Sequence, residues 1–375
     1  MTTAHINGIG TAVPEHDIHQ PINAVLRTML PDQRTRRVFD RMTEHSGIGH
    51  RYSFMRAGGR ADEQEVEEQE VDAGGFYPRG NFPGTRARMA LYETQAPRLA
   101  RRAVAALERE IPTGALDDIT HLVVASCTGF TAPGLDLQLA TELGLRPDVQ
   151  RTLVGFMGCS AAVPALRVAY QAVNTDPAAR VLVINLELCS LHLQESSDLN
   201  ALLPLTLFAD GASAALVTAQ PTGIALLDFL SMIISDSCDL MTWHIGEQGF
   251  NMHLSGQVPQ RIKQTLREDM EQAGANKILR GEQVKDFDLW AIHPGGRSVL
   301  DAVEAGLGLA PADLSSSRRI LHDYGNMSSA TVMFVLQDML RVHQTRDNHH
   351  DEARGMAMAF GPGMVAETFR FQMAG

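Results

Sequence analysis

A cysteine, a histidine and an asparagine are the residues of this chain whose types and positions suggest covalent chemistry. Cys159 lies in the segment Gly158-Cys-Ser-Ala-Ala162, directly before an apolar-periodic stretch, 163–173, that predicts a helix. A thiol at a helix N-terminus meets the positive end of the helix dipole, which lowers the thiol pKa and favours the nucleophilic thiolate. Taken alone, however, a single cysteine is more often a buried structural thiol.

Two polar residues in the second half of the chain occupy comparable positions. His293 follows the apolar strand Leu289–Ile292 and precedes Pro294-Gly-Gly296, where the glycines leave room for a ligand. A hydrogen-bonded loop histidine explains this position equally well. Asn326 precedes Met327-Ser-Ser-Ala330, the predicted start of a helix, where asparagine is also a favoured N-cap. Neither residue indicates chemistry on its own.

An internal repeat places the three residues at one site. From residue 116 onward, short apolar strands alternate with helices, which is the α/β pattern. The strand at Leu122 recurs at Leu289 and the turn at Cys159 recurs at Asn326, in both cases after 167 residues. Ligands of open α/β sheets gather at the carboxyl ends of the strands. We therefore expect two similar halves whose matching turns bring Cys159, His293 and Asn326 together.

The composition excludes several classes of function. The 375 residues carry 32 basic and 44 acidic side chains, a formal net charge of −12, so neither nucleic acid nor an anionic membrane is expected as a partner. The amino terminus has no signal-peptide pattern, and no apolar run approaches the ~20 residues of a membrane span. Four cysteines without Cys-x-x-Cys spacing predict reduced thiols in a cytoplasmic protein.

Two polar segments are predicted to be surface rather than sites. The acidic stretch 61–72 is interpreted as a solvated loop or helix face. His343 and the pair His349-His350 lie in a polar stretch without ligand spacing, so no metal site is expected.

The Cys159, His293 and Asn326 motifs resemble those of the type III polyketide synthases, the chalcone synthase-like enzymes of the thiolase superfamily. The resemblance extends from about Arg37 to Phe371, and its Phe-Gly-Pro-Gly ending separates the chain from ketoacyl synthases, thiolases and hydroxymethylglutaryl-CoA synthases. It implies a thiolase-like, five-layered αβαβα fold built from two duplicated halves, residues 1–220 and 221–375, and a homodimer. The matching blocks are Phe39–Met42, Cys127–Gly129, Pro133-Gly134, Gly144–Pro147, Gly158-Cys159, Leu207–Ala212, His293–Gly296, Tyr324–Ala330 and Phe360–Gly363.

The resemblance also implies a reaction. Cys159 would hold a starter acyl group as a thioester, while His293 would stabilise the thiolate. His293 and Asn326 would then stabilise the enolate that forms when malonyl-CoA loses CO2. Acyl-CoA and malonyl-CoA would be the substrates, and no cofactor is expected. A single-round ketoacyl synthase-like enzyme and an aromatic-starter chalcone or stilbene synthase remain the alternatives.

Further positions are assigned by the same resemblance. Phe208 matches the phenylalanine that gates the reaction cavity, and Arg41 and Arg297 are candidates for binding CoA. The cavity residues differ from those of plant chalcone synthases and favour a medium or long fatty acyl starter and an alkylpyrone or alkylresorcinol product. The starter itself, the number of extensions and the type of ring closure stay open at this level. The expected cavity residues are Cys127, Cys189, His192, Trp243, Met252 and Ser328.

Overall fold

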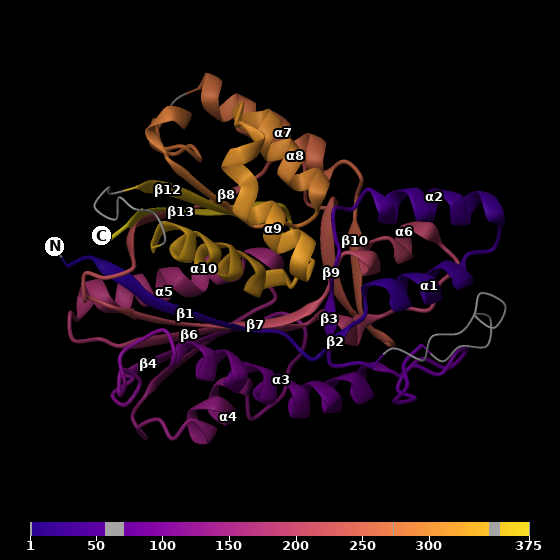
Figure 1. Ribbon diagram of the computed structural model, residues 1–375, viewed down its shortest axis with the longest axis horizontal. Coiled ribbons are helices and arrows are strands. Elements are labelled where there is room, and N and C mark those ends of the chain that lie inside the picture. Colours follow the sequence, from indigo (N-terminus) through magenta and orange to yellow (C-terminus); the bar gives the residue numbers. More distant parts are fainter. Residues whose placement is uncertain (1, 57–70, 273, 345–352, 375) are drawn as a thin grey trace.

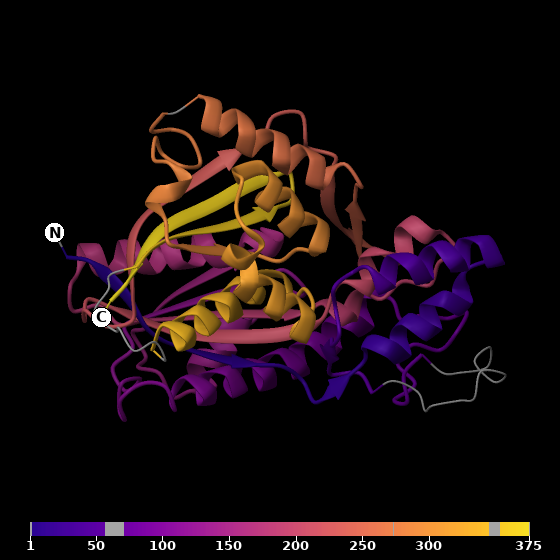
Figure 2. The same ribbon diagram turned by 45° about the horizontal axis from the view of Figure 1, so that its top comes forward.

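The computed structural model describes residues 2–56, 71–272, 274–344 and 353–374, which form alternating layers of helices and sheet (Figures 1 and 2). Residues 61–70 of the acidic stretch and the pair His349-His350 lie outside these ranges. The described end of the stretch is not solvated, because Val71 and Asp72 are buried and the Asp72 carboxylate accepts backbone N–H groups as far as Tyr77. No helix in the described ranges is both long and apolar enough to cross a membrane.

One sheet runs through both halves of the described chain in the order β11-β12-β13-β8-β1-β7-β6-β4-β5. Its central strands are apolar on both faces; all eight residues of β6, for example, are buried. The first half supplies β1 (Ala4–Ala12), β4 (His121–Ser126), β5 (Gln150–Gly155), β6 (Val181–Leu188) and β7 (Asp210–Thr218), and the second half supplies β8 (Ile224–Ile233), β11 (Leu289–Ile292), β12 (Arg354–Gly361) and β13 (Val365–Met373).

The strand pairing confirms the duplication predicted from the repeat. In the first half, β4 pairs parallel with β6, and β6, β7 and β1 follow antiparallel. In the second half, β11 pairs parallel with β12, and β12, β13 and β8 follow antiparallel. The strands β1 and β8 join the halves. In the described second half no strand corresponds to β5, which ends the sheet on the first half's side.

The helices complete the expected five layers (Figure 1). The helices α5 (Ala162–Thr175) and α10 (Thr331–Gln344) lie between the two parts of the sheet. Outer layers are formed by α3 (Thr85–Leu107) and α4 (Leu135–Glu142) on one side, and by α7 (Val258–Glu271) and α8 (Arg297–Leu307) on the other. A helix that is apolar all round is buried, and α10 buries every residue from Thr331 to Gln337.

A smaller group of elements packs at one end of the layers, on the right of Figure 1. The hairpin of β9 (Met241–Gly246) and β10 (Gly249–Leu254) lies there, together with the short β2 (His16–Asp17) and β3 (Tyr52–Ser53). The helices of this end are α1 (His19–Met29), α2 (Gln33–Glu44) and α6 (Leu199–Leu202), while α9 (Ser315–Tyr324) leads from the second half toward it.

Candidate active site

Cys159 and Asn326 are in contact although they come from different halves. Cys159 lies in a 3₁₀ turn at the start of α5, and Asn326 lies just before the equivalent turn at the start of α10. The Cys159 Sγ is 3.9 Å from both Nδ2 and Oδ1 of Asn326. Nδ2 donates to the Gly295 carbonyl at 3.1 Å, and Oδ1 accepts from the Ser328 N–H at 2.8 Å. These bonds fix the amide and leave one N–H of Nδ2 for an acceptor beside the sulfur.

Close packing at the start of α5 requires glycine. Gly158 has a φ of +58°, and a Cβ at this position would lie 2.5 Å from the Pro362 side chain. A Cβ on Gly361 would lie 2.3 Å from the Ser160 hydroxyl. The C-terminal Gly-Pro-Gly turn therefore packs directly against the turn that carries Cys159.

His293 joins the same site through the loop that follows β11. It is buried, and neither ring nitrogen has a hydrogen-bond partner in the described part of the chain. The backbone N–H of Gly295 donates to the His293 carbonyl, and the Gly295 carbonyl holds Asn326. No hydrogen bond joins His293 to Cys159 among the described residues. Because buried polar atoms are normally paired, this imidazole is available to a bound molecule.

Burial dominates the electrostatics of the site. Removal from water raises the pKa of the Cys159 thiol to about 11, although hydrogen bonds with Ser328 and Asn326 act in the opposite direction. Burial likewise lowers the pKa of His293 to about 3. The lowered thiol pKa expected from the helix dipole is therefore wrong for the closed site. At neutral pH Cys159 is a thiol and His293 is a neutral imidazole.

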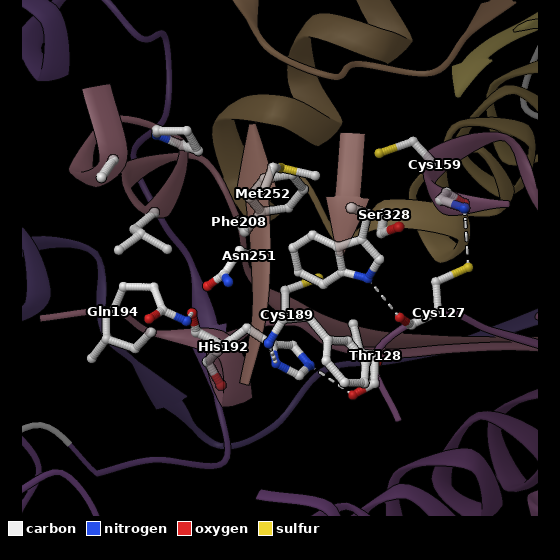
Figure 3. Close-up of a pocket in the computed structure, with 18 of the residues that line it drawn as sticks. Cys127, Thr128, Cys159, Cys189, His192, Gln194, Phe208, Asn251, Met252 and Ser328 are labelled. Atoms are coloured by element: carbon white, nitrogen blue, oxygen red, sulfur yellow. Dashed lines mark hydrogen bonds between the residues drawn. The ribbon is translucent and has the colours of Figure 1, made fainter. Parts of the chain in front are cut away.

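An inner cavity of about 360 Å³ lies beside Cys159 (Figure 3). Its lining includes all seven residues expected there: Phe208, Cys127, Cys189, His192, Trp243, Met252 and Ser328. In the close-up, the Cys159 sulfur points toward the side of the cavity where Met252 and Phe208 lie. The sequence did not indicate the further apolar side chains of the lining, which are Ile18, Ile22, Met55, Leu193, Ala201 and Leu205.

An aromatic group closes one side of the inner cavity. The His192 ring stacks on Phe250 at 4.2 Å and meets Trp243 edge-on at 5.2 Å. The Trp243 Nε1–H donates to the Cys127 carbonyl at 3.0 Å. His192 Nδ1 accepts the Phe250 N–H, so its proton lies on Nε2 and donates to the Thr128 carbonyl. Burial lowers the pKa of His192 to about 3, and the fixed neutral ring acts as a rigid wall.

The other two cavity thiols are buried as well. Cys127 Sγ accepts the Gly158 N–H at 3.1 Å. Burial raises the pKa of both Cys127 and Cys189 well above the ordinary value for a thiol. Both side chains pack as small apolar groups.

A second cavity, of about 610 Å³, lies outside the first. Leu207 lines this outer cavity, whereas the adjacent Phe208 lines the inner one. Arg297 also lines the outer cavity, where its Nη1 lies 3.5 Å from the His45 carbonyl. Arg41 does not line either cavity and is exposed on α2, so no cavity contact supports its expected role.

Two buried charged residues of the site were not found from the sequence. Glu187 accepts hydrogen bonds from the Cys127 N–H and the Thr128 and Ser329 hydroxyls, and so connects the two halves beneath the cavity. Burial raises its pKa to about 7. A single carboxylate within the apolar strand 181–188 is the signal that identifies it.

Arg51 is the second of these residues. Its guanidinium donates to the carbonyls of Leu205 and Phe208 and to the side chains of His19 and Asn23. The segment 205–209, which Arg51 holds, also pairs with the backbone of Asn326. The Asn326 backbone N–H donates to the Leu207 carbonyl, and the Asn326 carbonyl accepts the Ala209 N–H.

Comparison with known proteins agrees with this geometry. Residues 1–221 match the N-terminal domain of chalcone and stilbene synthases, and residues 227–373 match the C-terminal domain. The crystal structure of PKS-I from the brown alga Ectocarpus siliculosus is similar over 100% of this chain and 99% of its own, with 30% identity and a TM-score of 0.86.

Two more distant structures share the fold. The C-terminal type III polyketide synthase domain of Steely1, a type I/III hybrid from Dictyostelium, has 24% identity and a TM-score of 0.85 over 100% of both chains. CsyB, crystallised in complex with CoA-SH, has 22% identity and a TM-score of 0.81 over 99% of this chain and 100% of its own.

Proposed function

The chain belongs to the chalcone and stilbene synthase family and is a type III polyketide synthase, and we propose that it extends a medium or long fatty acyl-CoA starter with malonyl-CoA and cyclises the product to an alkylpyrone or alkylresorcinol. The observation that carries this proposal is the position of Cys159. It lies in contact with Asn326, whose amide is held by the loop of the unpartnered His293, and beside an inner cavity with a partly apolar lining.

Cys159 and His293 load the starter. The neutral imidazole takes the thiol proton, and the sulfur attacks the carbonyl of the starter acyl-CoA. The carbon–sulfur bond to CoA breaks, the proton passes to the CoA sulfur, and the acyl group remains on Cys159 as a thioester. The high pKa that burial gives the thiol makes His293 necessary for this step.

His293 and Asn326 then serve the extension step. Malonyl-CoA loses CO2 and leaves an enolate, whose oxygen carries the developing charge. The second N–H of Asn326, which faces the Cys159 sulfur, and a ring N–H of His293 are the donors that stabilise it. The enolate carbon attacks the Cys159 thioester, which lengthens the chain by two carbons and frees the thiolate for the next round.

The inner cavity favours an aliphatic starter. Its lining includes the apolar side chains of Ile18, Ile22 and Met55, against which a methylene chain gains ~0.8 kcal/mol for each buried CH₂. The wall of His192 and Trp243 limits the space available to the chain. CoA would occupy the outer cavity beside Arg297, and Phe208 would separate the two spaces.

The edge of the first half supports a homodimer. Strand β5 pairs only with β4 in the described sheet, so its outer edge is free. Around it Phe130, Leu137, Leu153 and Met157 are each between 37% and 44% exposed. A free edge strand beside large exposed apolar side chains is a surface that a second copy of the chain would cover.

Mass spectrometry of products tests the proposal. Purified protein is incubated with malonyl-CoA and a panel of starters from hexanoyl- to hexadecanoyl-CoA, with benzoyl- and coumaroyl-CoA alongside. We expect pyrones or resorcinols that carry two or three extender units on an aliphatic starter. Products from the aromatic starters alone would contradict the starter class, and a single extension with every starter would identify a single-round condensing enzyme.

A further inference from the structure

The first turn of α3 holds the aromatic wall of the inner cavity, formed by His192, Trp243 and Phe250, from outside. These wall residues come from two segments. His192 belongs to the turn Cys189–His192, and the other two belong to the hairpin of β9 and β10. In the described structure the hairpin strands pair only with each other, and no residue of α3 lines the inner cavity. The contacts of α3 with the two segments therefore act on the wall and not directly on a substrate.

Thr85 binds the tip of the hairpin. Its hydroxyl donates to the Gly246 carbonyl and accepts the Gly249 N–H at 2.9 Å, so it joins the facing ends of β9 and β10. Its backbone N–H donates to the Glu247 carbonyl at 2.8 Å. Thr85 is the first residue of α3, where N–H groups have no partner within the helix. The hairpin tip thus supplies the acceptor that the start of the helix needs.

Arg88 joins the hairpin to the second segment. The side chain is buried, and its Nη1 donates to the carbonyls of Leu191 and Leu193, which flank the wall histidine. The guanidinium also packs on Gly249, where a Cβ would lie 2.9 Å from the Arg88 Cδ. Because Arg88 follows Thr85 by three residues, the two side chains lie on the same face of α3.

A residue that only fills space does not explain the charge of Arg88. The acceptors of its guanidinium are neutral and comprise three backbone carbonyls and the Tyr77 hydroxyl. Among the described residues no carboxylate pairs with it, and its Nη2 has no hydrogen-bond partner. Burying a cation without a counter-ion costs stability. What the guanidinium provides is position, because its rigid planar fork holds two separate segments at defined angles.

We infer that Thr85 and Arg88 are positioning residues that fix the aromatic wall and thereby restrict the length and bulk of the polyketide. The inference rests on the proposed function, because it assumes that the growing chain occupies the inner cavity. Both residues act through the wall, and neither contacts the reacting atoms. Loss of the Thr85 hydroxyl would let the hairpin and its Trp243 move relative to His192, since no strand of the large sheet pairs with the hairpin.

Product analysis of hydroxyl variants tests the inference. Thr85→Val removes both bonds of the hydroxyl at nearly constant volume, and Thr85→Ser restores the hydroxyl. Thr94→Val makes the same change at an exposed site on α3, where the hydroxyl donates to the Leu91 carbonyl of the same helix. With dodecanoyl-CoA and malonyl-CoA, we expect Thr85→Val to raise the share of products with additional extensions ~5-fold, the typical equilibrium effect of one neutral hydrogen bond. Thr85→Ser and Thr94→Val should keep the wild-type distribution, and acylation of Cys159 should change by less than ~2-fold in all three.

Further measurements separate positioning from a general loss of stability. In a Trp243→Ala background, Thr85→Val should have little additional effect on the products, because the wall that it positions is already open. Acrylamide quenching of tryptophan fluorescence should rise in Thr85→Val and not in Thr85→Ser, since Trp243 is partly exposed whereas Trp290, the other tryptophan, is buried. Arg88→Lys, which keeps the charge but not the planar fork, should shift the products in the same direction as Thr85→Val.

Three results would overturn the inference. Wild-type products from Thr85→Val would show that its hydrogen bonds do not restrict the chain. An equal shift in Thr85→Ser would remove the hydroxyl as the cause. Full additivity of Thr85→Val with Trp243→Ala would place the effect outside the wall. If the wild-type protein extends no aliphatic starter at all, the proposed starter class fails instead, and the quenching comparison still tests whether Thr85 holds the hairpin.

Discussion

The Cys159 Sγ lies 3.9 Å from the Asn326 Nδ2 although 167 residues separate them in the chain. The contact exists because the two turns occupy equivalent positions in the two halves of a duplicated fold. One turn precedes α5, the other precedes α10, and the two turns face each other. Nucleophile and hydrogen-bond donor therefore come from different halves. An altered packing of the two halves would therefore separate Cys159 from Asn326. Each of the two side chains can be tested by its own substitution.

Asn326→Ala should impair decarboxylation more than loading. The substitution removes the N–H that we assign to the enolate, and loss of one such donor typically costs ~100–1000-fold in rate. Release of CO2 from malonyl-CoA and acylation of Cys159 are measured separately. Asn251→Ala, at another asparagine of the inner cavity, is the control. Equal losses in both steps would indicate that Asn326 only caps α10.

Trp243→Ala should change the products. The indole forms part of the aromatic wall and is anchored at the Cys127 carbonyl, so its removal enlarges the inner cavity. We expect bulkier starters or additional extensions, with a loss of ~1–3 kcal/mol in unfolding free energy because the side chain is only partly buried. Trp243→Phe keeps the aromatic packing and should retain the wild-type products. An unchanged product distribution in Trp243→Ala would show that the wall does not limit the chain.

Glu187→Gln should alter the pH dependence of stability. Burial raises the pKa of Glu187 to about 7, so the folded state holds a proton that the unfolded state has already lost above pH ~4.5. Wild-type stability should therefore fall relative to the variant as pH rises from 5 to 8, by about 3 kcal/mol. Urea unfolding across this range measures the difference. A constant difference would mean that the carboxylate ionises normally in the fold.

Leu153→Glu should prevent self-association. A charge beside the free edge of β5 would have to be buried in a dimer that covers this edge. Light scattering after size exclusion should give a monomer for this variant and a dimer for wild type. The control, Ile233→Glu, places the same charge at a residue that is 77% exposed on β8. If only the Ile233→Glu control dissociated the dimer, the dimer interface would lie on the second half of the chain instead.

Features that depend on periodicity were predictable from the sequence. The lag of 167 residues matched Cys159 with Asn326 and the strand at Leu122 with the strand at Leu289, and β4 and β11 occupy equivalent places in the two halves of the sheet. The seven residues that the family resemblance assigned to the cavity all line it, and their roles in the reaction stay predictions.

Features that depend on burial were not predictable. The pKa of Cys159 was expected to be low from the helix dipole, yet desolvation outweighs the dipole, and no local pattern reports how deeply a turn is covered. Arg41 is exposed on α2 and lines neither cavity, so its assignment to CoA binding stays a prediction. Arg51 was missed because its four acceptors come from distant segments of the chain.

Peptide mass spectrometry of the three cavity thiols tests the central claim most directly. Wild type and Cys159→Ala are mixed with dodecanoyl-CoA, then with malonyl-CoA, and Cys127, Cys159 and Cys189 are examined in each. We predict an acyl group on Cys159 alone, its replacement by longer ketide chains and a free thiol once malonyl-CoA is added, and no acyl group on the variant. An acyl group on Cys127 or Cys189, or on Cys159→Ala, would contradict the assignment of the nucleophile and with it the mechanism.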